Sequence, residues 1–384
     1  MSQPRLQSRR EYWVYPPEAT ETRRIEIAIK AAKASVTCGP SYDDAGIGDL
    51  QQKTAVLFDI PTHRHQEFRD WYELHYKGTI VEFRNTPPTN PGPDPDLTGL
   101  CRLGLHATAH GGAYSAADLQ QFADLQPDII KISSNHHPDS IRQLAQQHPG
   151  VTWILRIHYS TGGRAVTPTQ FVSETINDLP RILAILDGYS LDILIEIHNE
   201  PNLVSEGLYM AMPGVVSRET PGWCSGHQFN TWFLKTLQLL RQALPGRKFL
   251  FPGLSPGPTV QGVRQNHMNF ALLSYQAIQA ADALGVHTYW AGDDLAKAMS
   301  VVDWFRNQFP AKLIYITEAS NNQPWGTPDK ALQYADFWKQ LNHPDRDHVR
   351  GITYFVVSGE YPHETWVDRD MARQVRQHVA GRPH

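Results

Sequence analysis

Strand-like and helix-like segments alternate along most of this chain of 384 residues, and this alternation limits the folds it can adopt. Eight short runs rich in branched apolar residues are each followed by a stretch with apolar residues at helical spacing. The predicted strands are 103–106, 129–133, 151–158, 193–198, 248–252, 284–289, 313–317 and 352–357, and the predicted helices are 116–125, 140–147, 169–186, 229–244, 269–281, 295–308, 330–341 and 369–379. This repeat predicts a (β/α)8 TIM barrel. An open doubly wound sheet is disfavoured, because no glycine-rich nucleotide turn follows the first strand.

A proline-rich segment separates the predicted barrel from the start of the chain. Residues 87–99 contain prolines spaced too closely for a helix or a central strand, so we expect a linker there. The segment 1–86 has helix-like runs at 23–35 and 63–76 and strand-like runs at 54–60 and 79–84. We therefore expect a small α/β accessory module or extension, followed by a barrel over 100–384.

Composition and charge exclude several classes of partner. The formal net charge of -4 and the lack of any Lys/Arg run argue against nucleic acid and anionic membranes as partners. No apolar stretch is long enough to span a bilayer, and the polar N-terminal residues lack the apolar core of a signal peptide, which predicts a cytoplasmic protein. Cys38, Cys101 and Cys224 lie far apart, so we expect reduced thiols rather than disulfides or a zinc site.

Two glutamates follow strand-like runs that lie far apart in the sequence. Glu200 comes after the fourth predicted strand and Glu318 after the seventh. The strands of a TIM barrel present their C-terminal ends to one common site, so these carboxyl groups should converge there. A proton donor paired with a nucleophile or base is what hydrolysis of a glycosidic bond requires. Strand alternation places Glu196 in the interior below the site, where it needs Arg156 or Lys131 as a partner.

The 18 histidines raise the alternative of a metal-dependent hydrolase. The first predicted strand carries His106 and His110, a spacing that does not place two ligands on one face of a strand, and no aspartate closes the eighth strand. We therefore expect a site with no metal and no organic cofactor.

Three motifs resemble those of glycoside hydrolase clan A, the retaining (β/α)8 glycosidases. They are Asn199-Glu200-Pro201 on the fourth strand, Thr317-Glu318 on the seventh and His287-Thr288-Tyr289 on the sixth, and the first is similar to motifs of families 5 and 39. The resemblance implies that Glu200 is the general acid/base and Glu318 the nucleophile. It further implies that Asn199 binds the sugar 2-hydroxyl, that Tyr289 orients the nucleophile, and that His287 contacts the nucleophile or the substrate.

The chain departs from the family 5 pattern at two places. Thr317-Glu318-Ala319 replaces the usual glycine-Glu-aromatic sequence, and the eighth strand lacks the tryptophan that floors the first donor subsite. Phe355 or Trp366 could take that place. Further side chains expected to contact the sugar or to support the site are His106, Arg156, His158, His198, Trp290 and Trp325.

Together these observations predict a retaining β-glycoside hydrolase. Its substrate would be an oligo- or polysaccharide of glucan- or mannan-like type, and its two carboxyl groups should lie about 5–5.5 Å apart. The alternative from another class is a catalytically silent barrel that binds glycans.

Overall fold

The computed structural model describes residues 10–14, 37–39, 53–58, 65–75, 79–84, 101–161, 166–209, 222–324, 326–367 and 369–379. The chain divides into two compact units, one comprising Met1–Pro93 and Ala271–Gln276 and the other Asp94–Phe270 and Ala277–His384. The predicted linker at 87–99 and the predicted helix at 23–35 lie outside the described residues, so the domain boundaries stay predictions.

The N-terminal unit contains a small parallel sheet. Its strands follow the order β2-β1-β3-β4, where β1 is Arg10–Val14, β2 is Thr37–Gly39, β3 is Lys53–Phe58 and β4 is Ile80–Arg84. The helix α2, His65–His75, contributes Phe68 and Tyr72 to a core with Val14, Ala55 and Leu57. The predicted small α/β module is therefore present, and it includes two strands, β1 and β2, that were not predicted from the sequence.

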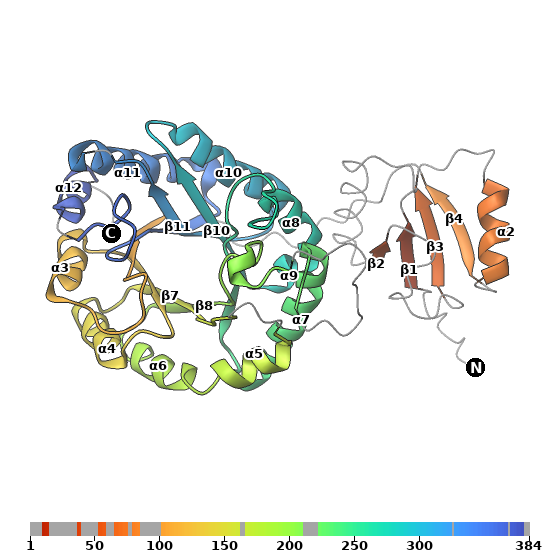
Figure 1. Cartoon of the computed structure of the whole chain (residues 1–384), viewed down its shortest axis with the longest axis horizontal. Helices are drawn as coiled ribbons and strands as arrows, with labels where there is room; N and C mark the ends of the chain where they lie inside the picture. Colours follow the sequence, from red (N-terminus) through yellow and green to blue (C-terminus); the bar gives the residue numbers. More distant parts are fainter. Residues whose placement is uncertain are drawn as a thin grey trace, which may run out of the picture. The chain divides into compact units, whose positions relative to one another are not determined.

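The second unit is a closed barrel of parallel strands surrounded by helices, as Figure 1 shows. Its strands are β5 (Arg102–His106), β6 (Ile129–Ser133), β7 (Thr152–Arg156), β8 (Asp192–Glu196), β9 (Lys248–Phe251), β10 (Ala283–Trp290), β11 (Ile314–Asn321) and β12 (Val349–Tyr354). They pair in chain order, and β12 closes the ring on β5. The predicted (β/α)8 barrel is confirmed.

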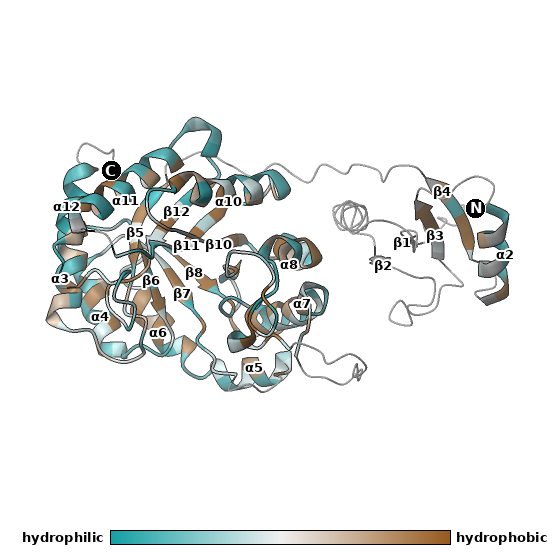
Figure 2. Ribbon diagram, turned by 45° about the horizontal axis from the view of Figure 1, so that its top comes forward, coloured by the Kyte–Doolittle hydropathy of each residue, from teal (hydrophilic) through white to brown (hydrophobic). Residues whose placement is uncertain are grey.

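The helices lie outside the strands and turn their apolar sides inward (Figure 2). They are α3 (Ala116–Leu125), α4 (Pro138–Gln147), α5 (Pro168–Thr175), α6 (Leu179–Leu186), α7 (Gly226–Ala243), α8 (His267–Leu273), α9 (Tyr275–Ala280), α10 (Leu295–Gln308), α11 (Thr327–Leu341) and α12 (Met371–His378). The prediction of one helix over 169–186 was wrong. Pro180 cannot donate a helical hydrogen bond, so it lies in the first turn of a separate helix, α6.

Apolar side chains fill the interior of the barrel. One buried cluster takes a side chain from each of six strands, β6 to β11: Ile129, Ile154, Leu194, Leu250, Ala283 and Tyr315. Leu194 precedes Glu196 by two residues on β8, so strand alternation directs both side chains into the interior. The charged layer described below therefore lies on an apolar floor, in a region from which water is excluded.

None of the helices in the described part of the chain is long and apolar enough to cross a membrane.

Candidate active site

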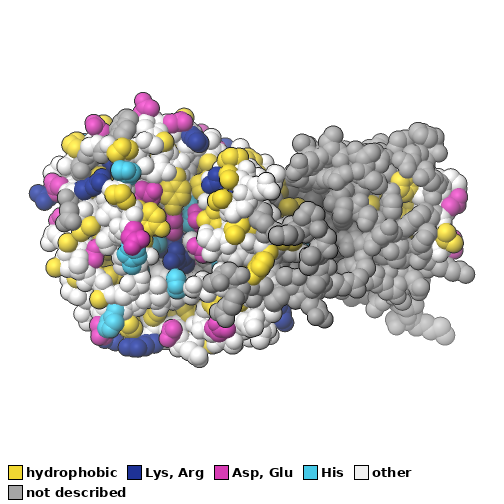
Figure 3. All heavy atoms as spheres, in the orientation of Figure 1, with side chains coloured by type: hydrophobic (Ala, Val, Ile, Leu, Met, Phe, Trp, Pro, Cys, Tyr) yellow, Lys and Arg dark blue, Asp and Glu magenta, His cyan; other side chains and the backbone are white. Residues whose placement is uncertain are grey.

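A cavity of about 830 Å³ opens at the C-terminal ends of the barrel strands, and Glu200 and Glu318 both line it. Figure 3 shows acidic, basic and histidine side chains gathered around the centre of this face. Glu318 lies within β11 and is 4 % exposed, whereas the side chain of Glu200 is 15 % exposed. One carboxylate oxygen of each lies within 4.8 Å of the other, and a nitrogen of His287 lies within the same distance of both.

Local backbone geometry brings these groups together. The pairing of β10 with β11 shifts register between Val286 and His287, which places His287 directly opposite Glu318. On the other side β8 ends at Glu196, and Glu200 lies in the following loop with a φ of 34°. The backbone N–H of Glu200 donates to the carbonyl of Gly253 at 3.1 Å. The register shift in β10 and the loop after β8 thus bring His287, Glu318 and Glu200 together.

Gly253 makes room for the His287 ring. A Cβ atom at position 253 would lie 2.0 Å from Cδ2 of His287, so any larger residue there would displace the ring. The ring is fully buried, and its Nδ1 lies 3.0 Å from Oε1 of Glu200. His287 Nδ1 also lies 3.6 Å from Oε2 of Glu318, so this residue contacts both carboxylates.

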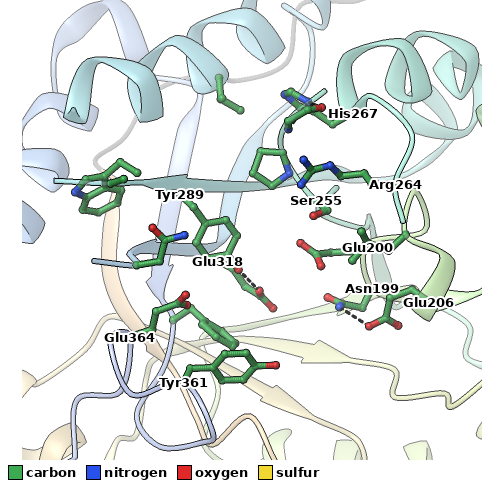
Figure 4. A pocket seen from close by; sticks show the side chains of 18 of the residues that line it. Asn199, Glu200, Glu206, Ser255, Arg264, His267, Tyr289, Glu318, Tyr361 and Glu364 are labelled. Carbon is green, nitrogen blue, oxygen red and sulfur yellow. Dashed lines mark hydrogen bonds between the residues drawn. The ribbon is translucent and has the colours of Figure 1, made fainter. Parts of the chain in front are cut away.

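Each oxygen of Glu318 has its own donor. Lys131 Nζ donates to Oε1 at 3.0 Å, and the Tyr289 hydroxyl donates to Oε2 at 2.6 Å (Figure 4). Burial raises the pKa of Tyr289 well above 10, with the charge of Glu318 acting in the same direction, so the hydroxyl keeps its proton. Two donors on one carboxylate fix its orientation and favour its charged form.

The environments of the two carboxyl groups shift their pKa values in opposite directions. Burial raises the pKa of Glu200, His287 partly offsets this effect, and the charge of Glu318 adds to it. Burial alone would also raise the pKa of Glu318, but His287 and Lys131 outweigh it, so that this pKa lies well below 4.5. Glu318 is therefore the anion and Glu200 the group that holds a proton.

Glu196 lies below the site, as the sequence predicted, and Lys131 is its partner. Lys131 Nζ lies 2.8 Å from Oε2 of Glu196, and the Thr317 hydroxyl donates to Oε1 at 2.7 Å. All of these side chains are fully buried. Lys131 therefore bridges a structural carboxylate and the carboxylate that faces the cavity.

His106, Arg156 and Phe355 also line the cavity. Burial, followed by the charge of Lys131, holds the pKa of His106 well below 6.5, so the ring is neutral at pH 7. Its Nδ1 lies 2.8 Å from the carbonyl of Ala107 and must carry the proton. Nε2 is then a buried acceptor with no hydrogen-bond partner among the described residues, 3.7 Å from Glu318, and it could accept from a sugar hydroxyl.

Asn199 lines the cavity beside Glu200, and its side-chain amide is hydrogen-bonded to Glu206. Asn199 Nδ2 donates to Oε1 of Glu206 at 3.2 Å, while Asn199 Oδ1 is buried without a partner in the described part of the chain. Burial raises the pKa of Glu206, and the charge of Arg156 opposes that shift. Glu206 therefore orients Asn199, the residue predicted to bind the sugar 2-hydroxyl.

Trp290 is in the cavity wall but is 2 % exposed, and its Nε1–H donates to Gln333. Trp325 lies outside the described residues. Stacking of a sugar on either ring stays a prediction.

Three other predicted contacts lie elsewhere. Trp366 is fully buried, packs against both Tyr334 and Tyr354 and does not line the cavity, so its predicted place at the cavity is wrong. His198 is also buried and packs 5.2 Å from Trp223, since its φ of 76° ends the strand alternation and turns the ring away from the cavity. His158 is exposed and borders a separate small pocket with Arg156.

The cavity contains residues that the sequence did not identify. They are Glu206, Ser255, Arg264, His267, Lys297, Tyr361 and Glu364, all of which lie in or beside the loops above the barrel. Burial raises the pKa of Glu364 to about 7, and the charge of Glu318 adds to that shift. Position in a loop after a barrel strand was the only signal available for these residues, and it does not select among many polar loop side chains.

Glu200, His287 and Glu318 are also the described residues best placed to hold a metal ion, because one ligand atom of each lies within 4.8 Å of the others. However, Lys131 Nζ and the Tyr289 hydroxyl already occupy the two oxygens of Glu318. A dication at this point would lie beside the ammonium group of Lys131, which opposes its binding.

Comparison with known proteins gives structural likenesses and no match in sequence families. No protein-family model matches the chain, and no curated protein does. Among solved structures, a GH128 (subgroup II) endo-β-1,3-glucanase from Sorangium cellulosum shows 16% identity over 74% of this chain and 100% of that chain, with a TM-score of 0.48.

Two further structures are similar at the same level. A modular endo-β-1,4-mannanase of glycoside hydrolase family 26 from Cellulomonas fimi shows 14% identity over 74% of this chain and 71% of that chain, with a TM-score of 0.49. GH5_18 from Streptomyces cattleya shows 15% identity over 74% of this chain and 82% of that chain, with a TM-score of 0.48. These matched structures are glycoside hydrolases of low sequence identity.

Proposed function

We propose that this protein is a retaining β-glycoside hydrolase acting on a glucan- or mannan-like β-glycan. The observation that carries the proposal is a pair of carboxyl groups, one oxygen of each within 4.8 Å of the other, whose surroundings shift their pKa values in opposite directions. Retaining glycosidases hold their two carboxyl groups about 5–5.5 Å apart, whereas inverting enzymes leave about 6.5–9.5 Å for a water molecule. The short separation supports direct attack by one of the two carboxylates.

In the first step Glu318 attacks the anomeric carbon, and Glu200 gives its proton to the departing glycosidic oxygen. Lys131 and Tyr289 hold the attacking carboxylate in place through their bonds to its two oxygens. The product is a glycosyl ester of Glu318, and the leaving group departs as a neutral alcohol.

Formation of that ester changes Glu200 into a base. The negative charge of Glu318 is one cause of the raised pKa of Glu200, and the ester removes this charge. The pKa of Glu200 then falls, so that it can take a proton from a water molecule that attacks the anomeric carbon. Hydrolysis of the ester returns Glu318 to its anionic form and Glu200 to its acidic form.

The proposal is tested with Glu200→Gln and Glu318→Gln on aryl β-glycosides and β-glycan polysaccharides. Glu360→Gln is the matched control, because Glu360 is exposed and lies in the loop above the barrel. Loss of an acid/base residue should reduce kcat roughly 10²–10⁴-fold, but much less on substrates whose leaving group needs no proton. Loss of the nucleophile should abolish turnover on all of them.

Azide provides the complementary measurement. It should restore activity to Glu318→Ala with an α-glycosyl azide as product, because azide then attacks from the vacated side. A β-glycosyl azide would reverse the two roles. Wild-type rates in both glutamine variants would refute the proposal and favour a barrel that only binds glycans.

A further inference from the structure

Two of the cationic side chains that line the cavity, Arg264 and Lys297, come from one stretch of the chain that contributes no carboxylate to it. The cavity wall formed by residues between Ser255 and Val301 contributes Arg264 and Lys297, but neither an aspartate nor a glutamate among its described lining residues. The carboxylates that line the cavity beyond Glu200 and Glu318 are Glu206 and Glu364, from other loops. One wall of the cavity is therefore cationic.

The Arg264 guanidinium packs against Gly257, where the absence of a side chain leaves room for it. Gly257 has a φ of 130°, and a Cβ atom added there would lie 2.5 Å from Nη2 of Arg264. Arg264 Nε donates to the carbonyl of Pro258 at 3.2 Å, which holds the group against this loop. The described residues provide no carboxylate partner for it within the distance of an ion pair. Two terminal nitrogens thus remain available to a ligand.

A buried histidine lies beside Arg264. His267 is 4 % exposed and lines the same wall, and its Nδ1 accepts from the backbone N–H of Gly257. Its Nε2 is buried without a hydrogen-bond partner in the described part of the chain. Burial lowers the pKa of His267, and the positive charge of Arg264 lowers it further, so His267 offers a neutral polar atom next to a fixed cation.

The part of this wall around Ser255 and Arg264 lies on the side of Glu200. In Figure 4 Ser255 and Arg264 lie next to Glu200, whereas Glu364 and Tyr361 lie on the side of Glu318. If Glu200 protonates the leaving group, as the proposed function requires, the sugar that departs lies beside Glu200 and so beside Arg264.

We propose that the Arg264 wall is a subsite for an anionic sugar on the leaving-group side of the cleaved bond. The anionic group is a carboxylate or a sulfate ester, because a guanidinium with two available nitrogens binds two oxygens of such a group at once. Lys297 adds positive charge, and Ser255 and His267 add neutral hydrogen-bonding atoms. This proposal rests on the proposed function and specifies its substrate as an acidic β-glycan.

Phenyl β-glycosides that differ only in the leaving group test the subsite. The meta substituent is a carboxylate, a sulfonate or a neutral carboxamide, and the sugar is the one that the protein hydrolyses best. We expect kcat/KM for the better anionic probe to exceed that for the carboxamide by about tenfold. In Arg264→Met this ratio should fall to about one, and in Lys297→Met it should fall less. The carboxylate and sulfonate arms distinguish a uronic acid from a sulfated sugar.

Two controls make the outcomes distinct. Arg142→Met removes an exposed arginine on α4 that pairs with Asp139 at 2.9 Å, and it should leave the ratio unchanged. Arg264→Lys keeps the charge without the planar fork and should retain part of the preference. Calorimetric titration with the same probes reports their Kd values whether or not they are hydrolysed.

A ratio near one in the wild-type protein, or a ratio that Arg264→Met leaves unchanged while the carboxamide is still hydrolysed, would overturn the subsite and leave the proposed function intact. If no probe is hydrolysed, the proposed function fails. Tighter binding of the anionic probes, lost in Arg264→Met, would then still support the anionic subsite.

Discussion

Lys131→Met removes the cation that lies between Glu196 and Glu318. In the wild-type protein Lys131 Nζ lies 2.8 Å from Glu196 and 3.0 Å from Glu318, and its side chain is fully buried. Methionine has a similar volume but no charge, so the variant leaves two buried carboxylates without their shared partner. We expect a less stable barrel and a nucleophile that is protonated at higher pH.

The magnitude follows from burial. Removal of one partner of a buried ion pair typically destabilises a protein by about 3–5 kcal/mol, because an uncompensated charge remains inside. Lys248→Met is the control, since Lys248 also lies on a barrel strand and pairs with Asp192 at 2.7 Å, but its side chain is 56 % exposed. Exposed pairs contribute about 0–1 kcal/mol, so the control should be close to wild type.

The effect should depend on pH in a defined direction. The pKa values of Glu196 and Glu318 lie below the ordinary 4.5, so in the wild type their stabilisation is present above pH 4.5 and is lost as the pH falls through the lowered values. Lys131→Met raises both values. The deficit in stability should therefore be largest near pH 7 and shrink toward acid pH.

The assays are urea denaturation at several pH values and a profile of kcat/KM against pH. The acidic limb of the profile reports the anionic form of Glu318, and we expect it to move to higher pH in Lys131→Met. The double variant Lys131→Met/Glu196→Gln should regain stability, because one of the two unpaired charges is gone. Equal stability deficits at pH 4 and pH 7, together with an unmoved acidic limb, would refute the reasoning.

The remaining predictions concern the cavity. Tyr289→Phe should reduce kcat about 10- to 100-fold in steady-state kinetics, because hydrogen bonds to charged groups contribute about 1.5–3 kcal/mol, and an unchanged kcat would contradict this role. Glu364 has a pKa of about 7, raised by burial, so the native state loses stability relative to the unfolded chain as the pH rises from 4.5 to 7. Glu364→Gln should remove this loss, and parallel curves of stability against pH for variant and wild type would disprove it. Dialysis against EDTA should leave hydrolysis unchanged, whereas a loss that zinc or magnesium restores would support the metal-dependent alternative.

Sequence reasoning identified the parts of the site that lie on strands. Glu196 on β8 was placed from strand alternation, and His287, Tyr289 and Glu318 on β10 and β11 were placed from their positions at the ends of the sixth and seventh predicted strands. The face of a strand on which a side chain lies follows from alternation along that strand. The place of each strand in the barrel follows from the order of the strands along the chain. His198 escaped the rule because its left-handed backbone ends the alternation.

Residues on loops could not be selected in this way. Trp366 lies in the segment after β12 and Trp290 is the last residue of β10, yet the first packs in the core and the second borders the cavity. Arg264, Glu206 and Glu364 are single polar residues in segments with no periodicity. Their positions depend on how each loop folds over the barrel, which no short pattern encodes.

The sequence by itself determined the (β/α)8 architecture and the convergence of Glu200 and Glu318 at one end of the barrel. Both follow from a repeated alternation of apolar periodicities. Only the tertiary structure decided which carboxyl group holds the proton, because that depends on Lys131, Tyr289 and His287 within a few ångströms in a region that excludes water. The same holds for the cationic wall around Arg264, since electrostatic effects depend on distance and burial, and side chains far apart in the sequence acquire both only when the barrel closes.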